Sequence, residues 1–149
     1  MSYIAQASRL ISVPAEVAFD CLADHDSWAT WMPESFRPFG RSLGRLCPGM
    51  KFRVRILGSP LPVGVGVRVV DRARELTWGG GVPGVFLAEH RFLFEPRGDS
   101  SVEVRSVETW SGVIPRLLRR TILPSSERVG NDQLAALDAA SQARRAGRS

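Results

Sequence analysis

The sequence predicts an α+β fold in which a curved antiparallel sheet wraps around a long C-terminal helix, with two short helices after the first strand. Between residues 50 and 112, apolar and polar residues alternate with a period of two, which is typical of strands with one buried face. After Gly112 the apolar residues take helical spacing instead. Because a sheet with one dry face needs a cover, we expect this last amphipathic segment to lie across it.

The shorter elements follow in chain order. Residues 3–12 are rich in alternating apolar residues and predict the first strand. Pro14 stands where a helix can begin, and Glu16 in the next turn suits the positive end of the helix dipole. The tryptophan-rich segment 25–36 predicts a short helical turn or a loop that loses its helical potential at Pro33. Further strands are expected at residues 50–57, 63–70, 75–80, 85–96 and 102–112.

The C-terminal helix is expected to begin near Pro115. Pro124 lies inside this helix and has no N–H to donate, so we expect a kink or a break near it. Residues 1–143 are expected to form a single domain, and residues 144–149 a basic, disordered tail.

Composition limits the classes of function. The chain has 149 residues, 23% charged and 44% hydrophobic, which is usual for a soluble globular protein. No apolar run approaches the roughly 20 residues of a membrane span, and the N-terminal segment lacks the layout of a signal peptide, so we expect a cytoplasmic location. The net charge of +5 comes with scattered arginines and no recognition motif, so nucleic-acid binding is not expected.

The cysteines and one of the two histidines carry little functional signal. Cys21 and Cys47 lie in unrelated contexts, without a CxxC motif or a nearby histidine, and we expect both to be reduced and packed. His25 stands next to an expected helix end and is most simply a surface residue. We therefore expect no metal site and no cofactor.

The more informative histidine, His90, lies in the middle of an apolar strand. Side chains two residues apart share a face of a strand, so His90 is expected on the buried side with Ala88 and its aromatic neighbours. Folding the following hairpin about Gly98 places His90 beside Ser106 and Ala88 beside Glu108, and both strands then agree about the inner face. His90 and Glu108 become diagonal neighbours on that face.

Three interpretations of His90 are open at this point. It could be a core imidazole bonded to Glu108 or Ser106, or it could orient a bound ligand together with Glu108. It could also be catalytic, polarising a carbonyl while Glu108 acts as a general base with a raised pKa. Burying both groups without partners would cost several kcal/mol, whereas water or a ligand in a cavity satisfies them, and this favours a cavity.

Arg68 has two alternative placements. If the strand 63–70 pairs with its neighbours without a bulge, Arg68 and two glycines point inward, and the arginine could meet a carboxylate ligand. A single bulge reverses the pattern and sends Val65, Val67 and Val69 inward, which their apolar chemistry favours.

The segment "VPAEVAFDCLADHDSWATWMP" (13–33) resembles the entry motif of the START-like helix-grip superfamily (SRPBCC proteins), in particular its bacterial polyketide cyclase/dehydrase branch. The segments "ELTWGGG", "AEHRFLFEP" and "VETWSG" are similar to later motifs of that branch. The resemblance implies a helix-grip fold, in which about seven antiparallel strands grip the C-terminal helix around an apolar cavity. Because the superfamily includes lipid carriers, hormone receptors and aromatase/cyclases, the resemblance does not fix the substrate.

The leading hypothesis is binding of a small hydrophobic molecule, such as a lipid, a polyketide or an aromatic compound, between sheet and helix. One alternative is a cyclase/dehydratase-type enzyme that uses Glu108 and His90 as an acid–base pair. A second is a protein-binding regulator that uses the basic surface of the last helix, and a homodimer is also considered. The candidate ligand-binding residues are Trp31, Phe52, Val54, Arg68, Trp78, Phe86, Ala88, His90, Phe92, Ser106, Glu108, Trp110, Leu118 and Ile122.

Overall fold

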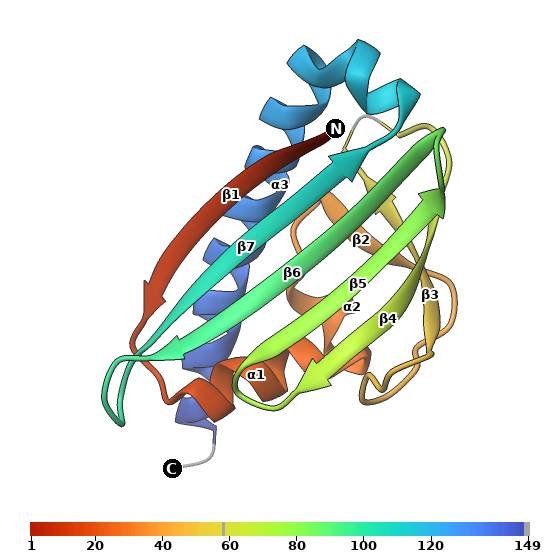
Figure 1. Ribbon diagram of the computed structural model, residues 1–149. Helices are drawn as coiled ribbons and strands as arrows, with labels where there is room; N and C mark the ends of the chain where they lie inside the picture. Colours follow the sequence, from red (N-terminus) through yellow and green to blue (C-terminus); the bar gives the residue numbers. More distant parts are fainter. Residues whose placement is uncertain (58, 148–149) are drawn as a thin grey trace.

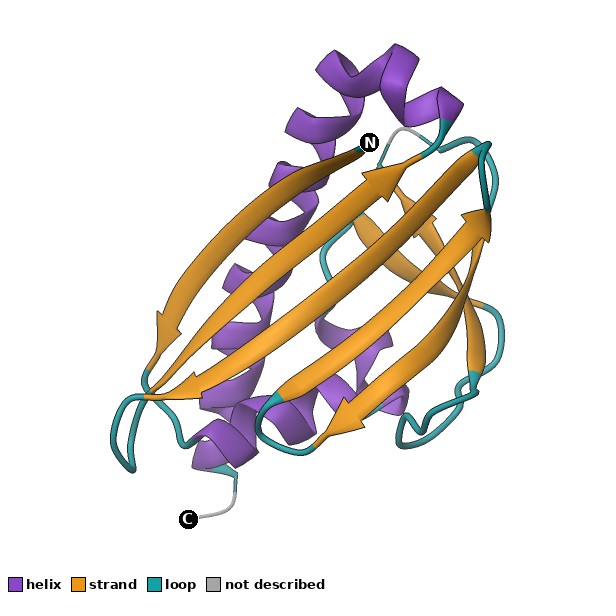
Figure 2. Cartoon of the chain, in the orientation of Figure 1, coloured by secondary structure: helices purple, strands orange, loops and turns teal. Residues whose placement is uncertain are grey.

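The computed structural model describes residues 1–57 and 59–147, in which one seven-stranded antiparallel sheet curves around a long helix (Figure 1, Figure 2). The strands are β1 (Ser2–Ile11), β2 (Phe36–Phe39), β3 (Lys51–Ile56), β4 (Val63–Asp71), β5 (Glu75–Val82), β6 (Phe86–Pro96) and β7 (Val102–Ser111). The helices are α1 (Ala15–Ala23), the 3-10 helix η1 (His25–Ser27), α2 (Trp28–Trp31) and α3 (Val113–Ala146). The predicted α+β helix-grip fold, with short helices after the first strand, is confirmed.

The sheet brings the first strand beside the last. Its order is β1-β7-β6-β5-β4-β3-β2, and β1 pairs with β7 from Ser2 opposite Ser111 to Ile11 opposite Val102 (Figure 1). The four-residue edge strand β2, which the alternation pattern did not predict, pairs with β3. Helix α3 packs mainly against β1, β7 and α1, and so covers one side of the sheet.

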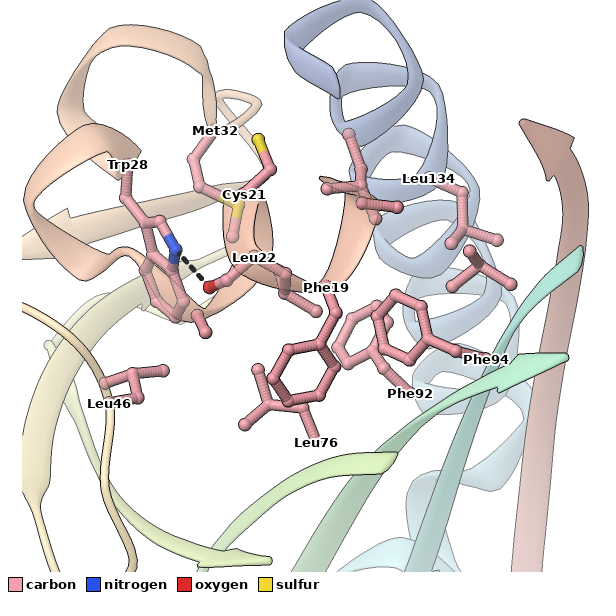
Figure 3. Packing of buried hydrophobic residues seen from close by; sticks show 14 of the residues in the cluster. Phe19, Cys21, Leu22, Trp28, Met32, Leu46, Leu76, Phe92, Phe94 and Leu134 are labelled. Atoms are coloured by element: carbon pink, nitrogen blue, oxygen red, sulfur yellow. Dashed lines mark hydrogen bonds between the residues drawn. The ribbon is translucent and has the colours of Figure 1, made fainter. Parts of the chain in front are cut away.

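The short helices close one end of the fold. Helix α1 begins directly after Pro14, whose carbonyl accepts hydrogen bonds from the N–H groups of Val17 (3.0 Å) and Ala18 (3.3 Å). The indole N–H of Trp28 donates to the carbonyl of Leu22 (2.9 Å; Figure 3) and fixes the turn after α1. Large buried side chains from α1, the sheet and α3 fill this end: Phe19, Leu22, Trp28, Leu76, Phe92, Phe94 and Leu134.

Helix α3 is bent, as its proline suggested. Its backbone departs from helical geometry at Leu118 (φ −107°, ψ 17°), less than two turns before Pro124. A proline inside a helix removes one donor, and its ring crowds the preceding turn. The first turns of α3 consequently lie at an angle to the rest of the helix (Figure 1). Within the described residues, no helix combines the length and apolar character needed to cross a membrane.

The end of α3 differs from the expected disordered tail over residues 144–149. The helix continues to Ala146, because Arg144 pairs with Asp24 (Nη1 to Oδ2, 3.3 Å) and Arg145 donates to the backbone carbonyl of residue 12 (2.9 Å). The last two residues of that predicted tail lie outside the described residues. The domain boundary at residue 143 stays a prediction.

The β6–β7 hairpin has a register two residues from the expected one. His90 lies directly opposite Glu108, rather than opposite Ser106 and diagonal to Glu108. The N–H of Arg97 donates to the carbonyl of Ser101 (2.8 Å) across the connecting loop, so the turn is centred later in the sequence than we assumed. A shift of two residues keeps every side chain on its face, and the expected inner face is therefore the observed one.

Two expectations outside the sheet are wrong. His25 is buried rather than on the surface: its Nδ1 accepts a hydrogen bond from the N–H of Leu43 (3.2 Å), and its ring packs against Trp28. The segment before β3 folds back over it. Cys21 is buried as expected, whereas Cys47 is exposed.

Candidate functional site

A cavity of about 580 Å³ lies between the sheet and the first half of α3, away from the end that α1 fills. Small-molecule sites commonly have volumes of about 300 to 1,000 Å³. Its wall is mainly apolar, and its residues come from β2 to β7 and from α3. Ile114 and Leu118, which are 41% and 53% exposed, lie at its rim, so the cavity is open to solvent there.

Glycines in β4 and β5 shape one wall of the cavity. Gly64, Gly79 and Gly80 all lie in the lining. A Cβ atom on Gly80 would collide with the backbone carbonyl of Gly64, so the two strands can approach this closely only without a side chain there. The small side chain of Ala88, opposite Gly80 on β6, keeps the adjoining space empty.

The structure brings more than half of the predicted ligand-binding residues to this cavity. Trp78, Phe86, Ala88, His90, Glu108, Trp110, Leu118 and Ile122 line it. The remaining six lie elsewhere. Phe52, Val54 and Phe92 are buried in the core, and Ser106 lies behind His90 as its hydrogen-bond partner. The indole of Trp31 donates to the Ser27 hydroxyl (2.9 Å), outside the cavity lining.

Arg68 does not reach the cavity. A β-bulge between Val67 and Val69 shifts the pairing of β4 with β5, and Val65 and Val67 are buried. The two valines point inward as expected, but Val65 lies opposite the buried Phe52 in an unshifted part of the β3–β4 pairing, whereas Val69 lies beyond the bulge and is 36% exposed. The guanidinium of Arg68 lies 3.6 Å from the carboxylate of Glu89.

Several cavity residues escaped the sequence analysis. Val63 faces the cavity because of the β4 register, and Phe36 was not predicted because the strand β2 was missed. Ser126 is a polar residue on the buried side of α3, and that position was the available signal for it. The other lining residues that were not predicted are Ile56, Leu57, Ser59, Pro60, Gly64, Gly79, Gly80, Ile114, Thr121, Ser125 and Val129.

His90 is held in place at the inner wall. Its side chain is 4% exposed, and its Nε2 lies 2.6 Å from the hydroxyl of Ser106. Its ring stacks on Phe92, with centroids 4.3 Å apart, and meets Trp78 at a steep angle. Its Nδ1 lies 3.2 Å from a carboxyl oxygen of Glu108 but makes no well-aligned hydrogen bond with it. The Nδ1 atom is therefore the polar group of this ring that is left without a full partner.

Glu108 connects His90 to helix α3. Its side chain is 13% exposed and shares a hydrogen bond with the hydroxyl of Ser126. The same hydroxyl accepts a hydrogen bond from the indole N–H of Trp110 (3.1 Å). Glu108 on β7 thus contacts polar groups on both sides: Ser126 on α3 and His90 on β6.

Burial sets the protonation of this pair. Desolvation lowers the pKa of His90 to about 3, because the charged imidazolium loses its hydration. Desolvation also raises the pKa of Glu108 to about 8, an effect that the Ser126 hydrogen bond partly offsets. Burial thus favours the neutral imidazole and the neutral carboxylic acid over an ion pair.

This arrangement can recognise a polar group on an otherwise apolar molecule. A neutral carboxylic acid can both donate and accept a hydrogen bond, and an imidazole nitrogen can do one or the other according to its tautomer. His90 and Glu108 both line the cavity, next to the rings of Trp78 and Trp110. No cluster of three or more His, Cys, Asp or Glu side chains suited to a metal ion occurs among residues 1–57 and 59–147.

Solved structures with the same fold share little sequence with this chain. The Zhui aromatase/cyclase from a Streptomyces species superposes with a TM-score of 0.72 at 14% identity, covering 97% of this chain and 96% of that one. A norcoclaurine synthase point mutant from Thalictrum flavum gives a TM-score of 0.70 at 14% identity, covering 100% and 98%. A hypothetical protein from Helicobacter pylori gives 0.73 at 16% identity, covering 93% and 88%.

The sequence itself identifies the family. No curated protein sequence matches the chain significantly. The model of one protein family, described as polyketide cyclase/dehydrase and lipid transport, matches residues 4–142. This match covers nearly the whole chain and agrees with the resemblance in the motifs and with the helix-grip fold. The protein therefore belongs to the polyketide cyclase/dehydrase and lipid transport family.

Proposed function

We propose that the protein binds a small hydrophobic molecule, such as a lipid, a polyketide or an aromatic compound, in the cavity between the sheet and α3. The observation that carries this proposal is the largely buried contact between His90 and Glu108, 3.2 Å apart, at the inner wall of an otherwise apolar cavity of about 580 Å³. Burying these two polar groups opposes folding, because both lose hydration and the carboxylate of Glu108 is disfavoured inside the wall. A ligand that hydrogen-bonds to them offsets part of that cost.

The wall chemistry indicates how such a ligand would lie. Its polar end, a carbonyl or hydroxyl, would meet Glu108 and the Nδ1 of His90. Its apolar body would pack against the rings of Trp78, Phe86 and Trp110 and extend toward the rim at α3. Recognition would then combine nonpolar burial with one or two directed hydrogen bonds, which is how most small-molecule sites are built.

Filling the cavity tests the proposal. The protein is purified without denaturation, and native mass spectrometry identifies any small molecule bound to it. Ala88→Leu places extra carbon atoms in the cavity, and we expect the ligand to be lost. Ala139→Leu adds the same atoms at an exposed position of α3 and should retain it. A ligand that stays bound to the Ala88→Leu variant would contradict the proposed site.

An enzyme of the cyclase or dehydratase kind is the second candidate, and the burial of the Glu108 carboxyl in the cavity wall is the observation that favours it. Because its pKa is raised to about 8, this carboxyl keeps a proton at pH 7 that it can transfer. General acid catalysis therefore suits Glu108 at neutral pH better than the general-base role suggested by the sequence. The Nδ1 of His90 lies 3.2 Å away and helps to position this carboxyl, but the lowered pKa of His90 opposes transfer of the proton to its ring.

Glu108→Gln separates the two candidates. Glutamine keeps the size and hydrogen-bonding capacity of the side chain but does not transfer a proton. A carrier should bind the co-purified molecule nearly as well with glutamine at this position, and no chemical conversion of that molecule should be seen in the wild type. Conversion by the wild type that Glu108→Gln abolishes, with binding kept, would favour the enzyme.

A cytoplasmic location, a homodimer and the absence of nucleic-acid binding stay predictions of the sequence.

A further inference from the structure

Exposed large aliphatic side chains gather at the end of the molecule where the cavity opens. Leu117 is 75% exposed and Leu61 is 71% exposed, although leucine side chains are usually buried. Four others from the β5–β6 turn and the start of α3 are between 46% and 56% exposed: Val82, Val85, Val113 and Leu118. We call these six side chains the rim cluster.

Backbone contacts hold the parts of the rim cluster together. The N–H of Val113 donates to the carbonyl of Gly84 (3.1 Å), and the N–H of Ile114 to that of Val85 (2.9 Å), which ties α3 to the β5–β6 turn. Pro60, next to Leu61, shares the cavity wall with Ile114. In Figure 1 the β5–β6 turn, residues 59–62 and the first turns of α3 all lie toward the top of the molecule.

Basic side chains flank the rim cluster without acidic partners. Arg116, Arg119 and Arg120 lie in the first turns of α3, one before and two after the bend at Leu118. All three are exposed, and none forms an ion pair within the described residues. The sequence has no acidic residue between positions 109 and 126, and none between 35 and 70, where seven basic residues occur.

We propose that the rim cluster and these three arginines dock the protein on the surface of an anionic lipid bilayer. An exposed aliphatic patch beside a basic helical face is the pattern of interfacial membrane binding, in which apolar side chains enter the headgroup region and arginines meet anionic headgroups. The opening of the cavity lies within the same surface, so docking would place it against the lipid. The proposal concerns the outer surface and does not depend on what the cavity binds.

A second copy of the chain and a protein partner fit this surface less well. Two copies joined through the rim cluster would bring six exposed arginines together without an acidic group to pair with them, which opposes association. The six side chains of the rim cluster are aliphatic and include neither Trp nor Tyr, the aromatic residues that are enriched at the energetic centres of protein interfaces. A fluid lipid surface accepts protruding aliphatic side chains without a shaped pocket.

Vesicle co-sedimentation of the full chain tests the proposal. We expect binding to vesicles of phosphatidylcholine mixed with phosphatidylglycerol in equal amounts, and much weaker binding to phosphatidylcholine alone. An arginine near an anionic surface strengthens binding about fivefold, so changing Arg116, Arg119 and Arg120 to Gln should weaken it about a hundredfold. Leu117→Ser should weaken it at least about tenfold, because the lost leucine no longer leaves water.

Matched controls separate this surface from general charge and hydrophobicity. Leu10, 58% exposed near the opposite end of β1, is changed to Ser, and Arg97, Arg105 and Arg128 are changed together to Gln. These distant changes should leave vesicle binding within about twofold of the wild type, because electrostatic attraction to the lipid falls off within about a Debye length. Thermal melting of each variant confirms that it is folded.

Four results would overturn the proposal: no binding to the anionic vesicles, equal binding to both kinds of vesicle, equal weakening by the control changes, or a stable dimer that Leu117→Ser dissociates. Ala88→Leu, which fills the cavity, should keep wild-type vesicle binding. A protein that binds vesicles but holds no ligand would therefore contradict the proposed function alone, and the reverse result would contradict the docking surface alone.

Discussion

The space between the sheet and α3 has a filled half, which is packed with side chains, and a hollow half, which contains the cavity. The difference lies in the side chains that α1 inserts. In the filled half, α1 inserts Phe19 and Leu22 between the layers, and Phe94 of β6 meets Phe19 edge-on with centroids 5.2 Å apart. In the hollow half, the layers face each other across the cavity, and Phe86 of the same strand lies on its wall. One helical insertion after β1 thus decides which half is packed core and which half contains the cavity.

The largest expected effect compares two phenylalanines on the same face of β6. Phe94→Ala removes a ring that is 5% exposed and should lower the free energy of unfolding by about 3 to 5 kcal/mol. Phe86→Ala should cost only about 1 to 2 kcal/mol, because one side of that ring already lacks packing partners. Chemical denaturation at one pH measures both. Equal losses would show that the hollow half is as important to stability as the filled half.

The hollow half should lose stability as the pH rises. Unfolded Glu108 ionises near its ordinary pKa of 4.5, whereas folded Glu108 keeps its proton up to about pH 8, so stability falls with pH across this window. His90, with a folded pKa of about 3, contributes the opposite slope between 3 and 6.5 and cancels the loss there. Between pH 6.5 and 8 the wild type should therefore lose about 2 kcal/mol.

Glu108→Gln should be free of this loss above pH 6.5, which denaturation at several pH values can measure. Glutamine has no proton to release, so the stability difference between the variant and the wild type should grow with pH and level off above about 8. A constant difference from pH 5 to 9 would mean that Glu108 titrates normally in the folded protein.

The filled half should show the opposite sign. Asp20 of α1 accepts hydrogen bonds from Arg45 (2.9 Å) and Arg72 (2.8 Å), and the bond from Arg72 is the main cause that lowers its pKa to about 2. The stability from this lowered pKa is present above pH 3.8 and lost as the pH falls through about 2.

Asp20→Asn should therefore cost about 1 to 2 kcal/mol near neutral pH, a modest loss because both arginines are half exposed and screened by water. The difference from the wild type should shrink in acid. Denaturation between pH 2 and 7 measures it, with the exposed Asp99→Asn as control. A difference that grew in acid would contradict the ion pairs.

The smallest expected effect is that of filling the hollow half. Ala88→Leu adds apolar atoms where the protein leaves space, so the free energy of unfolding should stay within about 0.5 kcal/mol of the wild type or rise slightly. A similar small-to-large substitution beside Phe94, in the filled half, would overpack the core. A loss of more than about 2 kcal/mol, read from denaturation curves, would mean that Ala88 is already tightly packed.

The fold was largely predictable because its pattern tolerates errors in register. Alternation with a period of two places His90 and Glu108 on the inner face whether the hairpin turns at Gly98 or one residue later. That pattern does not encode the length of the turn, so the direct pairing of His90 with Glu108 was missed. The strand β2 was missed as well, since Phe36–Phe39 is too short to alternate and contains Pro38.

The site was less predictable because it depends on contacts between distant segments. The hydroxyl of Ser126 meets Glu108 and Trp110 only because α3 crosses β7 at that height. His25 is buried because a segment nearly twenty positions later folds over it, and nothing in its own neighbourhood indicates this. By contrast, helical spacing was enough to predict Leu118 and Ile122 in the cavity, because that prediction required only that α3 face the sheet and not which residues of the sheet it meets.

The pairing of β1 with β7 has a consequence for how the chain reaches this state. The neighbour of β1 in the sheet is the last strand to be synthesised, so the first strand stays unpaired while β2 to β6 emerge from the ribosome. Closing so long a loop is slow, and the waiting edge is open to wrong partners. The sheet, and with it the surface on which α3 packs, can therefore be completed only after β7 has been synthesised.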